Sequence, residues 1–177
     1  MMKIQGDQER KERIAGSGWA RAAIFLLLLC GICHMIGCNR LFYYPSSREY
    51  RTPQDLAVPV EEVRFKSEDG TGLHGWLLRP GEGREAAGTV VHFHGNAQNL
   101  SAHVGFVAWL AEHGYNVFVF DYRGYGKSDG SPERAGVIAD SRAALAYIRG
   151  RKDIDSSRLL VLGQSLGGAC ALAALGE

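Results

Sequence analysis

Apolar positions recur along the chain in short runs with the two periods of regular structure. Residues 60–65 alternate between apolar and polar, and residues 73–78 form a second run after turn-forming residues, which predicts a β-hairpin. Two further runs, residues 117–120 and 159–162, are continuously apolar, as expected of buried strands. Residues 89–94 form a run rich in β-forming residues.

Stretches of helical character separate these runs. Apolar residues in 100–113 have helical spacing, and Gly114 follows them. Pro132 begins a second predicted helix that ends near Arg149. An Ala- and Leu-rich stretch at the end of the sequence predicts a third. Strands that alternate with helices form a mostly parallel sheet with helices on both faces. The predicted fold class is therefore α/β, with residues 60–177 as the folded domain.

The first 59 residues follow a different pattern. Five Lys and Arg residues in 1–21 precede a nearly continuous apolar segment at 22–37, an order typical of a signal peptide. Met35-Ile-Gly-Cys38 resembles the lipobox of bacterial lipoproteins, which implies a lipidated Cys38. The alternative is an uncleaved anchor helix. We expect residues 1–38 to be a signal peptide with a lipobox or a membrane anchor, and residues 39–59, with three prolines, to be an extended linker.

Charge and cysteine content narrow the possible locations and partners. Positive charges before the apolar segment predict a membrane-anchored domain on the extracytoplasmic side. A net charge of +1 without a basic stripe gives no reason to expect a nucleic acid partner. Cys30, Cys33 and Cys38 lie in or beside the apolar segment, and Cys170 stands alone in a predicted helix, where a buried small residue is expected. We therefore expect no metal and no cofactor.

The candidate chemistry lies in Gly163-Gln-Ser-Leu-Gly167, between a predicted strand and a predicted helix. This is the layout of a nucleophile elbow, in which the turn at Ser165 is so tight that only small residues fit on either side. The helix that follows directs free backbone N–H groups at the site, and the N–H of Leu166 is placed to stabilise an oxyanion. The alternative is a glycine-rich turn with an ordinary N-cap serine.

Two further loops are expected beside Ser165, because loops at the carboxyl ends of parallel strands form the site. They are His94-Gly-Asn-Ala97 and Asp121-Tyr-Arg-Gly-Tyr-Gly-Lys-Ser128. With the Ser165 motif, they resemble the α/β-hydrolase superfamily, in its BEM46-like and serine aminopeptidase-like branch, over about residues 60–177. The resemblance implies that Ser165 is the catalytic nucleophile and that the backbone N–H groups of Asn96 and Leu166 form the oxyanion hole. It further implies hydrolysis of an ester, thioester or amide bond in a small or acylated substrate, through an acyl-enzyme.

Other interpretations of the same loops are weaker. Residues 126–128 match the end of a phosphate-binding loop, but that motif requires a glycine where Asp121 stands. His92 and His94 share the strand face opposite Phe93, without an apparent third metal ligand. We expect His94 to brace the oxyanion loop by a hydrogen bond. Asp121 is expected to cap or pair with the loop, since the family places its triad acid after a later strand.

The family pattern continues beyond the nucleophile helix with a triad acid and a histidine base, and no residue up to Glu177 matches either of them. A serine without a base is a weak nucleophile. The sequence therefore predicts the front half of a longer hydrolase. The alternative is a catalytically inactive fragment or a membrane-tethered, non-enzymatic interaction domain.

Overall fold

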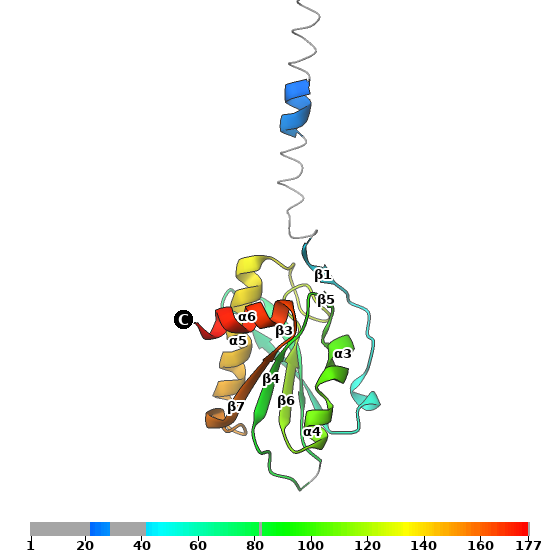
Figure 1. Cartoon of the computed structure of the whole chain (residues 1–177), viewed down its shortest axis with the longest axis vertical. Coiled ribbons are helices and arrows are strands. Elements are labelled where there is room, and N and C mark those ends of the chain that lie inside the picture. The colour runs from blue at the N-terminus through cyan, green and yellow to red at the C-terminus, as the bar shows by residue number, and fades with distance from the viewer. Residues whose placement is uncertain (1–21, 29–41, 82, 177) are drawn as a thin grey trace, which may run out of the picture. The chain divides into compact units, whose positions relative to one another are not determined.

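A computed structural model describes residues 22–28, 42–81 and 83–176 (Figure 1). The chain divides into two compact units, Met1–Phe42 and Tyr43–Glu177. Residues 22–28 of the first unit are helical with exposed side chains. Among the described residues, no helix has the length and hydropathy needed to cross a bilayer. Cys38 and the lipobox around it lie outside the described residues.

The second unit is built on a five-stranded sheet with the order β2-β3-β6-β4-β7. Its strands are β2 (Val60–Lys66), β3 (Gly72–Leu78), β4 (Thr89–Phe93), β6 (Asn116–Phe120) and β7 (Leu159–Gly163). The predicted hairpin, β2 with β3, is antiparallel, and β3 pairs antiparallel with β6. β6, β4 and β7 run parallel, so their carboxyl ends meet at one edge of the sheet (Figure 1).

Helices cover both faces of the sheet, as the alternating pattern predicted. On one face, α5 (Arg134–Gly150) and α6 (Leu166–Leu175) pack against a core that includes Phe65, Phe93 and Phe118. On the other, α3 (Leu100–His103), the 3-10 turn η2 (Val104–Phe106) and α4 (Trp109–Glu112) pack around Trp76 and Val119. The α/β class and its layered arrangement are confirmed.

The helix predicted for residues 100–113 is interrupted by η2. The cause lies in the preceding segment of the chain. Arg51 Nη1 donates to the carbonyl of Ala102, which would accept from the N–H of Phe106 in a continuous helix. The guanidinium carbon of Arg51 would lie only 3.1 Å from a Cβ on Gly105, so Arg51 also packs closely against η2. A long-range contact therefore replaces a local hydrogen bond, and the prediction of one helix was wrong.

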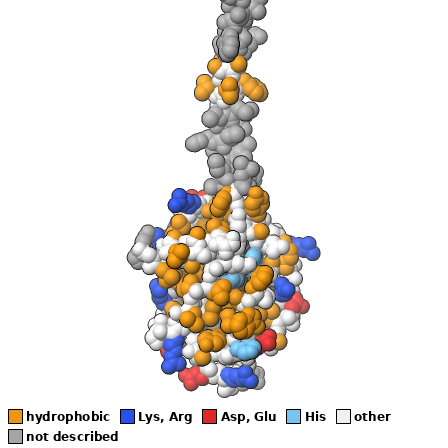
Figure 2. Space-filling model, in the orientation of Figure 1, with side chains coloured by type: hydrophobic (Ala, Val, Ile, Leu, Met, Phe, Trp, Pro, Cys, Tyr) orange, Lys and Arg blue, Asp and Glu red, His pale blue; other side chains and the backbone are white. Residues whose placement is uncertain are grey.

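β7 is a strand, but it is not buried as predicted. Leu159 and Val161 pack against the core beneath α5 and α6. The alternate residues Leu160 and Leu162 are 52% and 40% exposed. β7 stands last in the sheet order, and the core beneath α3 and α4 includes none of its described residues. Figure 2 shows several hydrophobic side chains exposed on the side of the molecule on which Figure 1 presents β7, β4 and α4.

The segment expected to be an extended linker packs on the sheet domain from Tyr43 onward. β1 (Tyr44–Pro45) pairs in parallel with β5 (Ala97–Gln98), just after β4, and η1 (Pro53–Asp55) adds a short turn. The side chain of Tyr43 is buried, whereas those of Phe42 and Tyr44 are exposed. The chain therefore enters its second unit beside the loop expected to form the oxyanion hole.

Candidate active site

Ser165 lies in the turn between β7 and α6 with a backbone that few non-glycine residues adopt. Its φ is +52° and its ψ is −116°. Such a conformation is strained for an L-residue and is held only when the surroundings impose it. Ser165 occupies the N-cap position of α6, but its hydroxyl makes no capping hydrogen bond, and the residue is exposed. The alternative of an ordinary N-cap serine is therefore wrong.

The glycines on either side of Ser165 are required by close backbone contacts. A Cβ on Gly163 would lie 2.5 Å from the Cα of Gly168. A Cβ on Gly167 would lie 2.0 Å from the carbonyl oxygen of Phe93, at the end of β4. Real Cβ atoms essentially never come so close to backbone, so the motif spacing matches the packing of α6 onto β4 and β7.

The loop after β4 lies directly beside this turn. Gln164 N–H donates to the Phe93 carbonyl at 2.9 Å, and a Cβ on Gly95 would be 3.9 Å from the Cβ of Ser165. Leu166 is the first residue of α6, where a backbone N–H has no intrahelical acceptor. The structure therefore brings together the loop of Asn96 and the turn of Ser165 and Leu166, as the sequence predicted.

His94 braces this loop, as expected. Its Nδ1 donates to the carbonyl of Gly95 at 2.7 Å, and the side chain is buried. In a planar trans peptide the N–H points away from the C=O. Fixing the Gly95 carbonyl therefore also fixes the direction of the Asn96 N–H.

Two tyrosines from the loop after β6 hold the same segment. Tyr122 Oη donates to the carbonyl of His94 at 3.3 Å, and Tyr125 Oη donates to that of Asn96 at 2.7 Å. Burial raises the pKa values of both phenols, so they remain neutral donors at physiological pH. The family resemblance implied that residues 122–128 form a structural loop beside the site, but it did not reveal these two contacts.

Asp121 lies beneath the loop and has the structural role predicted for it. Its Oδ1 accepts from the N–H of Leu100, at the start of α3, at 2.7 Å. His94 Nε2 lies 3.4 Å from Oδ1, and His74 Nδ1 lies 3.8 Å from Oδ2. Burial acts to raise the pKa of Asp121, but its contacts with His74, His94 and Leu100 outweigh burial and lower it. The carboxylate therefore stays charged and supports the loop from below.

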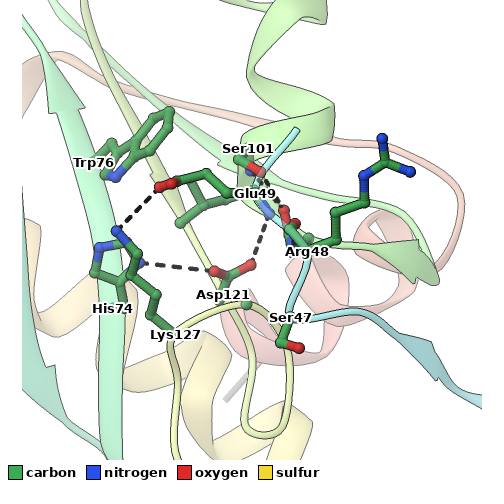
Figure 3. A pocket seen from close by; sticks show the side chains of 11 residues that line it. Ser47, Arg48, Glu49, His74, Trp76, Ser101, Asp121 and Lys127 are labelled. Carbon is green, nitrogen blue, oxygen red and sulfur yellow. Dashed lines mark hydrogen bonds and ion pairs between the residues drawn. The ribbon is translucent and has the colours of Figure 1, made fainter. Parts of the chain in front are cut away.

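A small pocket opens beside Asp121 (Figure 3). His74, Trp76 and Ser101 line it, and Lys127 pairs with Glu49 across it at 3.1 Å. The pocket lining does not include Ser165 or either neighbouring glycine. We therefore place the candidate site at the Ser165 turn and not in this pocket.

The described histidines have other neighbours than the Ser165 hydroxyl. His74 donates to Glu62, and His113 contacts the Trp109 carbonyl. His92 is buried with neither ring nitrogen hydrogen-bonded, and burial lowers its pKa to about 3. No group of three or more His, Cys, Asp or Glu side chains within the described ranges could hold a metal ion.

His103 has a position that the sequence did not indicate. Its Nε2 donates to the Ala97 carbonyl at 2.9 Å, and its Nδ1 lies 2.8 Å from Gln164 Oε1. It thus touches both the loop after β4 and the residue before Ser165. A histidine within a predicted helix gave no signal of this role.

Comparison with known proteins places the chain in a family. The family model of serine aminopeptidase S33 matches residues 84–177, more than half of the chain. The protein YfhR of Salmonella typhi is 43% identical over 162 residues, which cover 88% of this chain and 54% of YfhR. Protein bem46 of Schizosaccharomyces pombe is 34% identical over 164 residues, which cover 89% of this chain and 54% of bem46. The chain spans about half the length of these relatives.

The fold is also similar to that of a solved hydrolase structure. An esterase from Pyrococcus furiosus superimposes with a TM-score of 0.65 and 30% identity, over 77% of this chain and 53% of the esterase. Three observations lead to the same conclusion: the match in sequence, the sheet with helices on both faces and the strained serine turn. The chain belongs to the serine aminopeptidase S33 family and has an α/β-hydrolase fold.

Proposed function

We propose that this protein is a serine hydrolase that cleaves an ester, thioester or amide bond through an acyl-enzyme at Ser165. One observation carries the proposal: Ser165 is held at a positive φ with an exposed hydroxyl that does not cap the following helix. Backbone strain of this kind gathers at functional sites. The similarity to a Pyrococcus furiosus esterase supports an ester as the first substrate class to test.

In the proposed reaction, Ser165 Oγ attacks the substrate carbonyl carbon and transfers its proton to a base. The tetrahedral oxyanion accepts hydrogen bonds from the N–H groups of Asn96 and Leu166, and donors of this kind each contribute on the order of 10²-fold or more to turnover. Collapse expels the alcohol, thiol or amine, which takes up the proton. Water then hydrolyses the acyl-serine by the same steps.

The proposal needs a general base for Ser165. His74, His94 and His103 are engaged in the contacts described above. We therefore assign the base and its acid partner to the half of the relatives' length that this chain does not span.

Hydrolysis of p-nitrophenyl acyl esters by the full-length protein tests the proposal. Ser165→Ala should reduce kcat by about 10⁴-fold or more, because residual rate would come only from the oxyanion hole and binding. Ser131→Ala, at an exposed serine in the loop before α5, is the matched control and should leave kcat unchanged. Undiminished hydrolysis by Ser165→Ala would refute the assignment of the nucleophile. Absence of hydrolysis by the parent would favour a non-catalytic interaction domain.

We further propose that the N-terminal segment anchors the protein to a membrane on its extracytoplasmic side, with Cys38 lipidated. The support is the order of basic residues, apolar run and lipobox-like Met35-Ile-Gly-Cys38. Cys38→Ser should leave an unprocessed precursor of higher mass, measurable by mass spectrometry of the membrane fraction. Unchanged processing would exclude lipidation and favour the uncleaved anchor.

A further inference from the structure

The oxyanion hole proposed above takes its two donors from different parts of the chain. Asn96 belongs to the loop after β4, and Leu166 belongs to the turn after β7. Both N–H groups must lie about 3 Å from the same substrate oxygen. The pairing of β4 with β7 ends at Phe93 and Gly163. One more backbone hydrogen bond follows it, from Gln164 N–H to the Phe93 carbonyl, and in the described part of the chain none joins residues 95–97 to residues 164–168.

His103 spans the gap beyond the ladder. Its Nε2 donates to the carbonyl of Ala97, one residue after Asn96, and its Nδ1 lies 2.8 Å from the side chain of Gln164, two residues before Leu166. One imidazole therefore contacts both segments that carry the oxyanion donors.

The ring is held firmly in this position. His103 is 8% exposed and stacks on His94, with ring centroids 5.3 Å apart and an interplanar angle of 21°. Its Cε1 would lie only 3.3 Å from a Cβ on Gly95, so the loop packs closely against it. His94 in turn donates to the Gly95 carbonyl. The two stacked imidazoles thus fix consecutive parts of one loop.

We propose that His103 is a positioning residue that holds the oxyanion loop and the nucleophile turn at the separation the transition state requires. This inference rests on the proposed function of Ser165. The amide of Gln164 can turn either its oxygen or its nitrogen toward Nδ1. The link is therefore retained whether the ring is neutral or charged.

Three substitutions separate the two hydrogen bonds. His103→Phe keeps a ring to stack on His94 and removes both bonds. His103→Asn keeps a polar atom near the position of Nδ1, facing Gln164, and His103→Gln keeps one near the position of Nε2, facing the Ala97 carbonyl. His113→Phe is the matched control, because His113 is an exposed histidine at the C-cap of α4, where it contacts the carbonyl and the ring of Trp109.

The measurement is the steady-state hydrolysis of p-nitrophenyl butyrate by each full-length variant, with Tm measured in parallel. We expect His103→Phe to lower kcat by about 10- to 100-fold, since misplacing a catalytic donor by about 1 Å can cost 10²-fold, while KM changes less than about twofold. His103→Asn and His103→Gln should each recover part of the loss, and His113→Phe should match the parent. A folded His103→Phe variant with the parent's kcat would overturn the inference.

Gln164→Met provides a second route if His103→Phe fails to fold. Gln164 is only half-buried, and this change removes the link to the turn alone. Like His103→Phe, Gln164→Met should lower kcat, and an unchanged kcat would overturn the inference. Absence of Ser165-dependent hydrolysis in the parent protein would instead refute the proposed function, so the two failures are distinguishable.

Discussion

Gly167 packs against the end of β4 more closely than any side chain permits. A Cβ there would meet the Phe93 carbonyl oxygen at 2.0 Å and the His94 carbonyl oxygen at 2.7 Å. A Cβ on the neighbouring Gly168 would lie 3.8 Å from its nearest atom, the carbonyl oxygen of Gly163, which is an ordinary contact. Close packing therefore requires glycine at position 167 but not at position 168.

Alanine substitutions should separate these two glycines. We expect Gly167→Ala to lower the free energy of unfolding by about 3 kcal/mol or more, because α6 must move away from β4. Gly168→Ala should be neutral or stabilising by up to about 1 kcal/mol, since alanine is the better helix former. Urea denaturation of both variants measures the difference, and equal effects would contradict the packing described here.

His92 makes stability depend on pH. Its side chain is 1% exposed, and burial lowers its pKa from 6.5 to about 3. The unfolded chain therefore binds a proton that the folded chain does not, so stability falls as the pH drops below 6.5. Between pH 6.5 and pH 5 the loss from this residue amounts to about 2 kcal/mol.

Replacing His92 with Phe should remove that dependence. Unfolding in urea at pH 7.5 and pH 5 should show a smaller loss of stability for His92→Phe than for the parent. His113→Phe, at an exposed histidine, should retain the parent's dependence. An unaltered pH profile in His92→Phe would show that another group dominates this range.

Among single residues, the sequence revealed those whose roles follow from local motifs. Ser165 and its flanking glycines stand at fixed spacing between a strand and a helix, so their placement could be predicted. His103 and Tyr125 could not be found in this way. They reach the site only through the folded sheet, and His103 and Gln164 are 61 residues apart in the sequence.

At the level of elements, the five strands of the main sheet matched the predicted runs, because apolar alternation and β-rich runs are local properties. Residues 100–113 did not form one helix, because Arg51, from the lead-in segment, binds the carbonyl of Ala102. The pairing of β1 with β5 also depends on partners that are distant in sequence. Local periodicity contains no information on either contact.

Asn99 connects α3 to the segment at residues 46–48, and a single substitution tests this role. Its Oδ1 accepts from Ser101 N–H as the N-cap of α3, and its Nδ2 donates to the carbonyls of Ser46 and Arg48, each at 2.7 Å. Asn99→Asp should keep the cap and lose both donated bonds. We expect faster hydrogen exchange in residues 46–50 without loss of protection in α3. Unchanged exchange in residues 46–50 would contradict this role.

Across the whole second unit, a buried ion pair joins distant segments. Arg123, after β6, contacts Asp140 in α5 and Asp69 in the β2–β3 turn, each at 2.8 Å. Asp140 is fully buried, and its hydrogen bonds raise the pKa of Arg123, with a smaller contribution from Asp69. A Cβ on Gly136 would overlap the guanidinium group of Arg123, so glycine at this position leaves the space that the group occupies.

Breaking this pair should destabilise the fold strongly. Asp140→Asn leaves the Arg123 charge buried with less compensation, and we expect a loss of about 3–5 kcal/mol in the free energy of unfolding. Asp153→Asn is the matched control, since Asp153 pairs with Arg151 and Arg79 but is half exposed, and its loss should stay below about 1 kcal/mol. Chemical denaturation distinguishes the two, and equal losses would contradict the assignment.

The mostly parallel sheet with helices on both faces was predictable, because strands that alternate with helices form that arrangement. The same rule placed the loop of Asn96 and the turn of Ser165 at one edge, which the structure confirms. The strand order β2-β3-β6-β4-β7 was not part of the prediction. The exposed Leu160 and Leu162 of β7 show that the residues of an edge strand and of a central strand can be equally apolar.

The central claim is that Ser165 is the nucleophile, and active-site labelling tests it most directly. The full-length protein is treated with a fluorophosphonate probe, digested and analysed by peptide mass spectrometry. We predict one covalent adduct, on the peptide that contains Ser165, which disappears after heat denaturation and in Ser165→Ala. No adduct on native protein, or an adduct that persists in Ser165→Ala, would contradict the claim.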